Sequence, residues 1–194
     1  MAFPYKKVLV VGATSGIGLA IAERLVQQGI FVIGVGRRKE NLDAFVQSQG
    51  SDKAAAVQFD ITKLDAIPGF VQDTTSGLAL VPILRCSNYC ASKAALHHWI
   101  LCLREQLKGS NIKVIEILPP AVQTELHDAK HQPDIVDGRN FGMPLDEFTN
   151  ETMEKLLLGE EQIPIGMAKN AFESFEKQRQ EIFTKLVETM KQKR

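Results

Sequence analysis

The alternation of strand and helix patterns in the first 60 residues constrains the fold of this chain more than any other feature. Apolar, largely β-branched runs at Val8–Val11, 31–35 and 56–59 are typical of buried strands. Helical apolar spacing separates these runs over 19–26 and 42–49. A helix between two buried strands joins them as parallel neighbours through a right-handed crossover. The sequence therefore predicts an α/β fold with a parallel sheet.

A glycine-rich turn of spacing G-x-x-x-G-x-G joins the first predicted strand to the first predicted helix. Glycine permits a tight turn and lets the backbone approach a pyrophosphate, while the following helix N-terminus offers free N–H groups and a positive dipole end. In this strand–turn–helix context we favour dinucleotide binding over a purely structural turn. The candidate cofactor-binding residues of the turn are Gly12, Thr14, Ser15, Gly16, Ile17 and Gly18.

Two arginines, Arg37 and Arg38, follow the second predicted strand. Dinucleotide-binding folds often place an acid there to hold the ribose 2′-hydroxyl of NAD, whereas arginine accommodates the 2′-phosphate of NADP. The first acid is only at Glu40. The alternative is that both arginines are solvated loop charges, but the pattern favours NADP over NAD.

A serine, a tyrosine and a lysine carry the candidate chemistry. Lys93 follows Tyr89 by four residues, and on a helix two residues at this spacing share one face. A helix is predicted over 92–108, and Ser76 precedes Tyr89 by thirteen residues. Tyrosine has a pKa of about 10, and a neighbouring lysine cation and an oxidised nicotinamide would favour its anion. Ser76 would hydrogen-bond the substrate oxygen, and Tyr89 would exchange a proton with it. The alternative is that Tyr89 and Lys93 are an ordinary surface pair, but their position downstream of a nucleotide-binding fold favours the catalytic interpretation.

Together these pieces resemble the short-chain dehydrogenase/reductase family. The likeness includes the glycine turn, the serine, the Tyr89–Lys93 motif and the segment 118–124. The resemblance implies a Rossmann-type doubly wound parallel sheet and NAD(P)-dependent hydride transfer, with Ser76, Tyr89 and Lys93 as catalytic residues. It further implies that Asp60 holds the adenine ring, that Val122 and Thr124 contact the carboxamide or phosphate, and that Tyr89 and Lys93 also contact the cofactor.

The sequence departs from this family between Asp60 and Ser76, which are separated by only fifteen residues without an asparagine. The family places two βαβ crossovers there, which need roughly 60 residues. An internal segment near 73–75, carrying strands 4 and 5, is therefore missing. The first strand would then expose an apolar edge on one wall of the cofactor crevice. We keep two hypotheses: an NADP-dependent oxidoreductase, or a catalytically impaired remnant or splice form that acts as a cofactor-binding or dimerising module.

The rest of the chain completes one expected NAD(P)-binding domain over 1–194. A further strand is predicted at 114–118, a substrate loop at 127–150 and a C-terminal amphipathic helix at 168–193. Phe141, Met143, Leu145 and Phe148 make the loop partly apolar, which favours a hydrophobic carbonyl or alcohol substrate. His97 and His98 are predicted to be ordinary helix residues.

Composition limits the partners and the compartment. Lys plus Arg and Asp plus Glu both number 23, so net charge gives no support for nucleic acid or an anionic membrane as partner. The three cysteines have no metal-ligand spacing, and their odd number fits a reducing compartment. Without a signal-peptide pattern or a membrane-length apolar run, we expect a cytoplasmic protein. We expect no bound metal, and a homodimer is left open.

Overall fold

The computed structural model describes residues 6–59, 75–110 and 113–192. Its first half contains β1 (Lys7–Val11), α1 (Gly16–Gln27), β2 (Phe31–Gly36), α2 (Lys39–Gln49), β3 (Ala54–Gln58), the short 3-10 helices η2 (Gly77–Ala79) and η3 (Leu84–Cys86), and α3 (Ser87–Gln106). Its second half contains β4 (Glu116–Leu118), η4 (Glu125–His127), η5 (Gly138–Asn140), α4 (Leu145–Leu157), β5 (Gln162–Pro164), α5 (Met167–Ala171), a π-helical turn η6 (Phe172–Glu176) and α6 (Lys177–Gln192).

The N-terminal half forms the predicted parallel sheet. The strand order is β1–β2–β3, and Val35 of β2 pairs with Val11 of β1 and Val57 of β3. Gly29, with a φ of 76°, ends the turn after α1, and its N–H donates to Val26. The α/β prediction is confirmed, because local apolar patterns and glycine turns specify each element.

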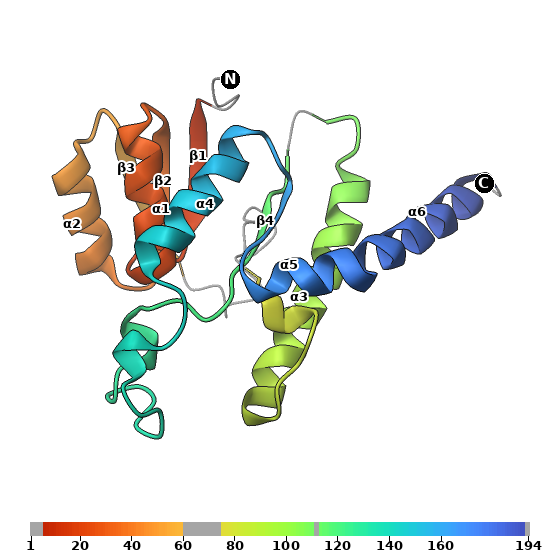
Figure 1. The fold of residues 1–194 in the computed structure, drawn as a ribbon. Coiled ribbons are helices and arrows are strands. Elements are labelled where there is room, and N and C mark those ends of the chain that lie inside the picture. Colours follow the sequence, from red (N-terminus) through yellow and green to blue (C-terminus); the bar gives the residue numbers. More distant parts are fainter. Residues whose placement is uncertain (1–5, 60–74, 111–112, 193–194) are drawn as a thin grey trace.

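The second half contributes a separate two-stranded sheet in which β4 and β5 are parallel. In the described ranges, β1 pairs with β2 alone and no strand joins the two sheets. Figure 1 shows the three-stranded sheet on one side of the molecule, with α3 and α6 on the other side of β4. The two sheets are therefore held together by packing and not by a continuous ladder.

One core links the two halves. α4 packs against α1 over the three-stranded sheet (Figure 1). Burial of apolar side chains from both halves is the main stabilising contribution here. The buried cluster includes Val10, Ile21, Leu25, Val32, Phe45, Phe148, Met153 and Ile163.

The substrate loop expected at 127–150 needs correction, because α4 begins inside it at Leu145. The acidic side chains Asp146 and Glu147 lie in the first turn of α4, where they complement the helix dipole. Phe148 is fully buried, and Leu145 and Met143 pack against the core. Of the apolar residues named in that loop, Phe141 remains exposed.

The helix that carries the candidate tyrosine is longer than predicted. α3 begins at Ser87 and not at residue 92, so it includes Tyr89 in its first turn. The range 168–193, predicted as a helix, contains α5, the π turn and α6 in succession. Along the described ranges, no helix combines the length and the apolar character needed to cross a membrane.

Candidate functional site

The glycine turn connects β1 to α1 in a conformation that requires glycine. Gly12 and Gly16 have φ values of 79° and 55°, and a Cβ on Gly18 would lie 2.3 Å from the Gly12 carbonyl oxygen. The N–H of Gly12 donates to the Val35 carbonyl at 2.8 Å, which anchors the turn to the end of β2. Ile17 packs against the hydrophobic core, which anchors the turn on its inner side.

The free side of this turn faces open space. A Cβ on Gly12 would meet no atom within 4 Å. Ser15, the residue that precedes α1, makes no side-chain capping bond, and the first turn of α1 has no acidic residue. The helix N-terminus therefore keeps backbone donors and a positive dipole end for an anion.

Arg38 lies over the glycine turn. The Arg38 guanidinium donates to Thr14 Oγ1 at 3.0 Å and to the Ser15 hydroxyl, and it pairs with Glu125 Oε1 at 3.0 Å. The side chain of Arg37 is exposed. Thr14 is held further by Asn41, whose Nδ2 donates to the Thr14 carbonyl at 2.7 Å. Asp60 lies outside the described residues.

The segment after β4 closes against the same turn. The Thr124 Cγ2 atom lies 3.3 Å from the position that a Cβ on Gly16 would occupy. Val122 is buried and forms a parallel bridge with Met143. Hydrogen bonds from Ser15 and Arg38 lower the pKa of Glu125, which follows directly after Thr124. The fold thus brings residues 12–16, 38 and 122–125 into one region.

Ser76 is attached to β4. Thr75 Oγ1 donates to the Ile117 carbonyl at 3.0 Å, and the Gly77 N–H donates to the Pro119 carbonyl at 2.9 Å. Between them, the buried Ser76 accepts a hydrogen bond from the Leu78 N–H at 3.2 Å. This segment runs beside the end of β4, as the neighbouring strand of a longer sheet would.

Tyr89 contacts this serine from α3, and Lys93 lies beside the Tyr89 ring. Burial raises the pKa of Tyr89, and a hydrogen bond with Ser76 acts in the opposite direction. Tyr89 as a whole is 45% exposed. Lys93 Nζ lies 5.7 Å from the centre of the Tyr89 ring, within the range of a cation–π contact. The three predicted catalytic residues therefore lie together.

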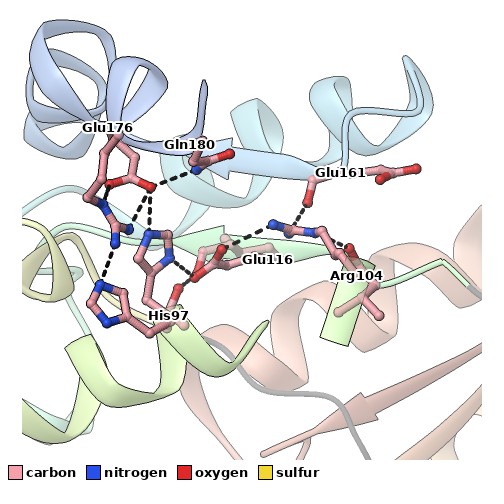
Figure 2. Close-up of polar contacts among 11 residues, drawn as sticks. His97, Arg104, Glu116, Glu161, Glu176 and Gln180 are labelled. Carbon is pink, nitrogen blue, oxygen red and sulfur yellow. Dashed lines mark hydrogen bonds and ion pairs between the residues drawn. The ribbon is translucent and has the colours of Figure 1, made fainter. Parts of the chain in front are cut away.

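A buried charged network under α3 was missed by the sequence analysis, which predicted ordinary roles for its histidines. His97 is 1% exposed and lies between two buried carboxylates, at 2.6 Å from Glu116 and 2.9 Å from Glu176 (Figure 2). Glu125 and Asn41 were missed as well. The one sequence signal for Glu125 is its position next to Thr124.

A family model described as short chain dehydrogenase matches this chain in two segments, residues 6–84 and 69–134. Together they span well over half of the chain. The chain therefore belongs to the short chain dehydrogenase family. Its Rossmann-type fold with parallel strands is the fold of that family.

Individual relatives agree with this assignment. An uncharacterized oxidoreductase, DltE, from Bacillus subtilis is 36% identical over 93 residues, which cover 48% of this chain and 36% of that protein. The matched segments span between 23% and 53% of the curated relatives. A short-chain dehydrogenase from Sphingobium yanoikuyae in complex with NADPH superposes with a TM-score of 0.71 at 21% identity, covering 92% of this chain and 95% of the other. A Burkholderia phymatum family member in complex with NAD gives 0.64 at 15% identity, covering 84% and 90%.

Proposed function

We propose that this chain binds NADP(H) at the glycine turn and transfers hydride between the nicotinamide and a carbonyl or alcohol substrate, with Tyr89 as the general acid and base. The observation that carries the proposal is the grouping of Ser76, Tyr89 and Lys93 at the end of β4. A serine hydroxyl, a phenol and a cation are the groups that such a proton transfer needs.

The cofactor site is supported by the residues present. The turn at 12–18 leaves space beside Gly12 and uncapped donors at α1, which suit a pyrophosphate. Thr124 and Val122 would line the nicotinamide side, and Lys93 would reach the adjoining ribose. Asp60 would hold the adenine. When bound, the cofactor supplies the hydride, and the protein supplies orientation and the proton.

Preference for NADP over NAD rests on Arg38. Arg38 follows the end of β2, the position at which a 2′-phosphate would bind. Its guanidinium donates to the Thr14 and Ser15 hydroxyls of the glycine turn. Arg37 precedes Arg38 in the sequence as a second exposed cation. The structural neighbours include complexes with NADPH, with NADP+ and with NAD, so the likeness of fold does not decide the cofactor and the proposal rests on these residues.

Tyr89 is suited to give a proton. Because burial raises its pKa, the phenol stays protonated at neutral pH and can donate to the oxygen of a carbonyl that receives hydride. Ser76 would hydrogen-bond the same oxygen. In the reverse direction, Lys93 and the positive charge of the oxidised nicotinamide would favour the phenolate.

Calorimetric titration with NADPH and NADH tests the cofactor site. Replacing Arg38 by alanine should weaken NADPH binding by roughly ten- to a hundredfold, the value of a charge-assisted bidentate contact, and should change NADH binding little. Arg37→Ala is the matched control and should lose less. Equal losses for both variants, or for both cofactors, would contradict the role of Arg38.

A second candidate is a catalytically silent cofactor-binding or dimerising module. The observation that favours it is the interruption between the two sheets, since β1 has a described partner on one side only. That module would bind NADPH without turning over any carbonyl. We also place the protein in the cytoplasm, supported by the three free thiols of Cys86, Cys90 and Cys102.

A further inference from the structure

The His97 network joins three elements of the fold at one buried point. The imidazole comes from α3, Glu116 from β4, and Glu176 from the last residue of the π turn (Figure 2). All three side chains are at most 1% exposed. A π turn inside a helix shifts the positions of its side chains, and here Phe172 and Glu176 are the buried residues of the turn.

Charged neighbours extend the network from two further elements. From α3, Arg104 Nη1 lies 3.5 Å from Glu116 Oε2, and its other nitrogens donate to the carbonyls of Val114 and Glu161. From α6, Arg179 and Gln180 both donate to Glu176. Burial opposes the charged form of His97, but the two glutamates outweigh it and raise the pKa of His97 to about 9. The network is therefore a paired set of buried charges, which is costly to open.

β4 is the element to which both parts of the candidate active site are attached. The Ser76 segment is bound to its backbone through the carbonyls of Ile117 and Pro119. The helix of Tyr89 is bound to its first residue through His97 and Glu116. The distance between the serine and the tyrosine thus depends on how α3 is fixed to β4.

The spacing along α3 connects the two sites. Tyr89, Lys93 and His97 follow each other at intervals of four residues, so they lie on neighbouring turns of one helix face. Tyr89 sits in the first turn, which has no side-chain cap but packs on η2, and the Ile83 N–H donates to Cys90 Sγ at 3.5 Å. The tie two turns further along adds a second attachment, which sets the angle at which this end meets Ser76.

We infer that His97 and Glu116 are positioning residues for Tyr89: their buried contact fixes α3 to β4 and so holds the phenol against Ser76. The inference rests on the proposed function, because it assigns the tie to the proton-transfer site. A positioning role differs from a purely stabilising one in a measurable way. Breaking the contact between His97 and Glu116 should weaken the hydrogen bond between Ser76 and Tyr89.

The test uses the hydrogen bond of the Tyr89 phenol at neutral pH, where His97 is charged, and it needs neither cofactor nor substrate. The chain has two tyrosines, so Tyr5→Phe leaves Tyr89 as the only one, and the chemical shift of its carbon-13-labelled Cζ atom reports hydrogen bonding of the phenol. In this background, Ser76→Ala should shift the Cζ resonance, because it removes the hydrogen bond between Ser76 and Tyr89. In the His97→Gln background, the same change should have no effect.

Controls separate positioning from stability. Met153→Ala removes a buried side chain of α4 and should lower the melting temperature while keeping the full response to Ser76→Ala. Glu116→Gln, which keeps the side-chain volume, is a second way to break the charged contact if His97→Gln does not fold. An equal response to Ser76→Ala with and without the network, or no response in either, would overturn the inference. Loss of NADPH binding would contradict the proposed function alone.

Discussion

The Arg38–Glu125 pair at the glycine turn and the His97 network under α3 are both built from opposite charges, but they differ in exposure. The first pair is 48% and 45% exposed, whereas His97, Glu116 and Glu176 are almost fully buried. Exposed pairs contribute about 0–1 kcal/mol, while removing one partner of a buried pair costs about 3–5 kcal/mol. The exposed pair can open for a ligand, and the buried one fixes the framework.

The largest expected difference between the two clusters is in the pH dependence of stability. The His97 pKa rises from 6.5 to about 9 on folding, so its contribution is complete below 6.5 and is lost as pH rises through 9. The loss should reach about 3 kcal/mol in the free energy of urea unfolding. His97→Gln should remove this alkaline loss. An unchanged alkaline slope in the variant would show that other groups cause it.

The acid side of the same profile depends on Glu176. Burial alone would raise its pKa, but hydrogen bonds from His97, Arg179 and Gln180 outweigh it and lower the value to about 2. Its contribution is therefore complete above the ordinary value of 4.5 and is lost as pH falls toward 2. The network should therefore contribute most to stability between pH 4.5 and pH 6.5, the ordinary pKa values of glutamate and histidine.

The exposed pair should give a smaller effect. Glu125→Gln frees Arg38 from a competing carboxylate, so NADPH affinity should rise about two- to fivefold, with a stability change below about 1 kcal/mol. Asp43→Asn, in the exposed Lys39–Asp43 pair of α2, is the matched control and should leave affinity unchanged. Weaker NADPH binding after Glu125→Gln would mean that Glu125 supports the bound cofactor and does not compete with it.

Much of the N-terminal half could be predicted because its signals are local. The turn of Gly12 and Gly16, the strand of Val8–Val11 and the helix after it each depend on neighbouring residues. The Tyr89 and Lys93 spacing is local too, and the family motif located Ser76. In contrast, α4 was missed because its apolar residues are interrupted by polar ones such as Thr149, which the structure buries.

The His97 network was not predictable in the same way. Its partners lie 19 and 79 residues away in the sequence, and no spacing rule connects them. The properties of His97 depend on its burial between two carboxylates, which its position on a helix does not reveal. The pairing of Arg38 with Glu125 likewise depends on a contact 87 residues apart, which the fold alone creates.

The most direct test of the account is NADPH oxidation by the 194-residue chain with a panel of hydrophobic aldehydes and ketones, comparing Tyr89→Phe with Tyr5→Phe. The account predicts turnover in the parent chain, a loss of at least about a hundredfold in Tyr89→Phe, and normal rates in Tyr5→Phe. Full activity in Tyr89→Phe, or NADPH binding without any turnover in the parent, would contradict it.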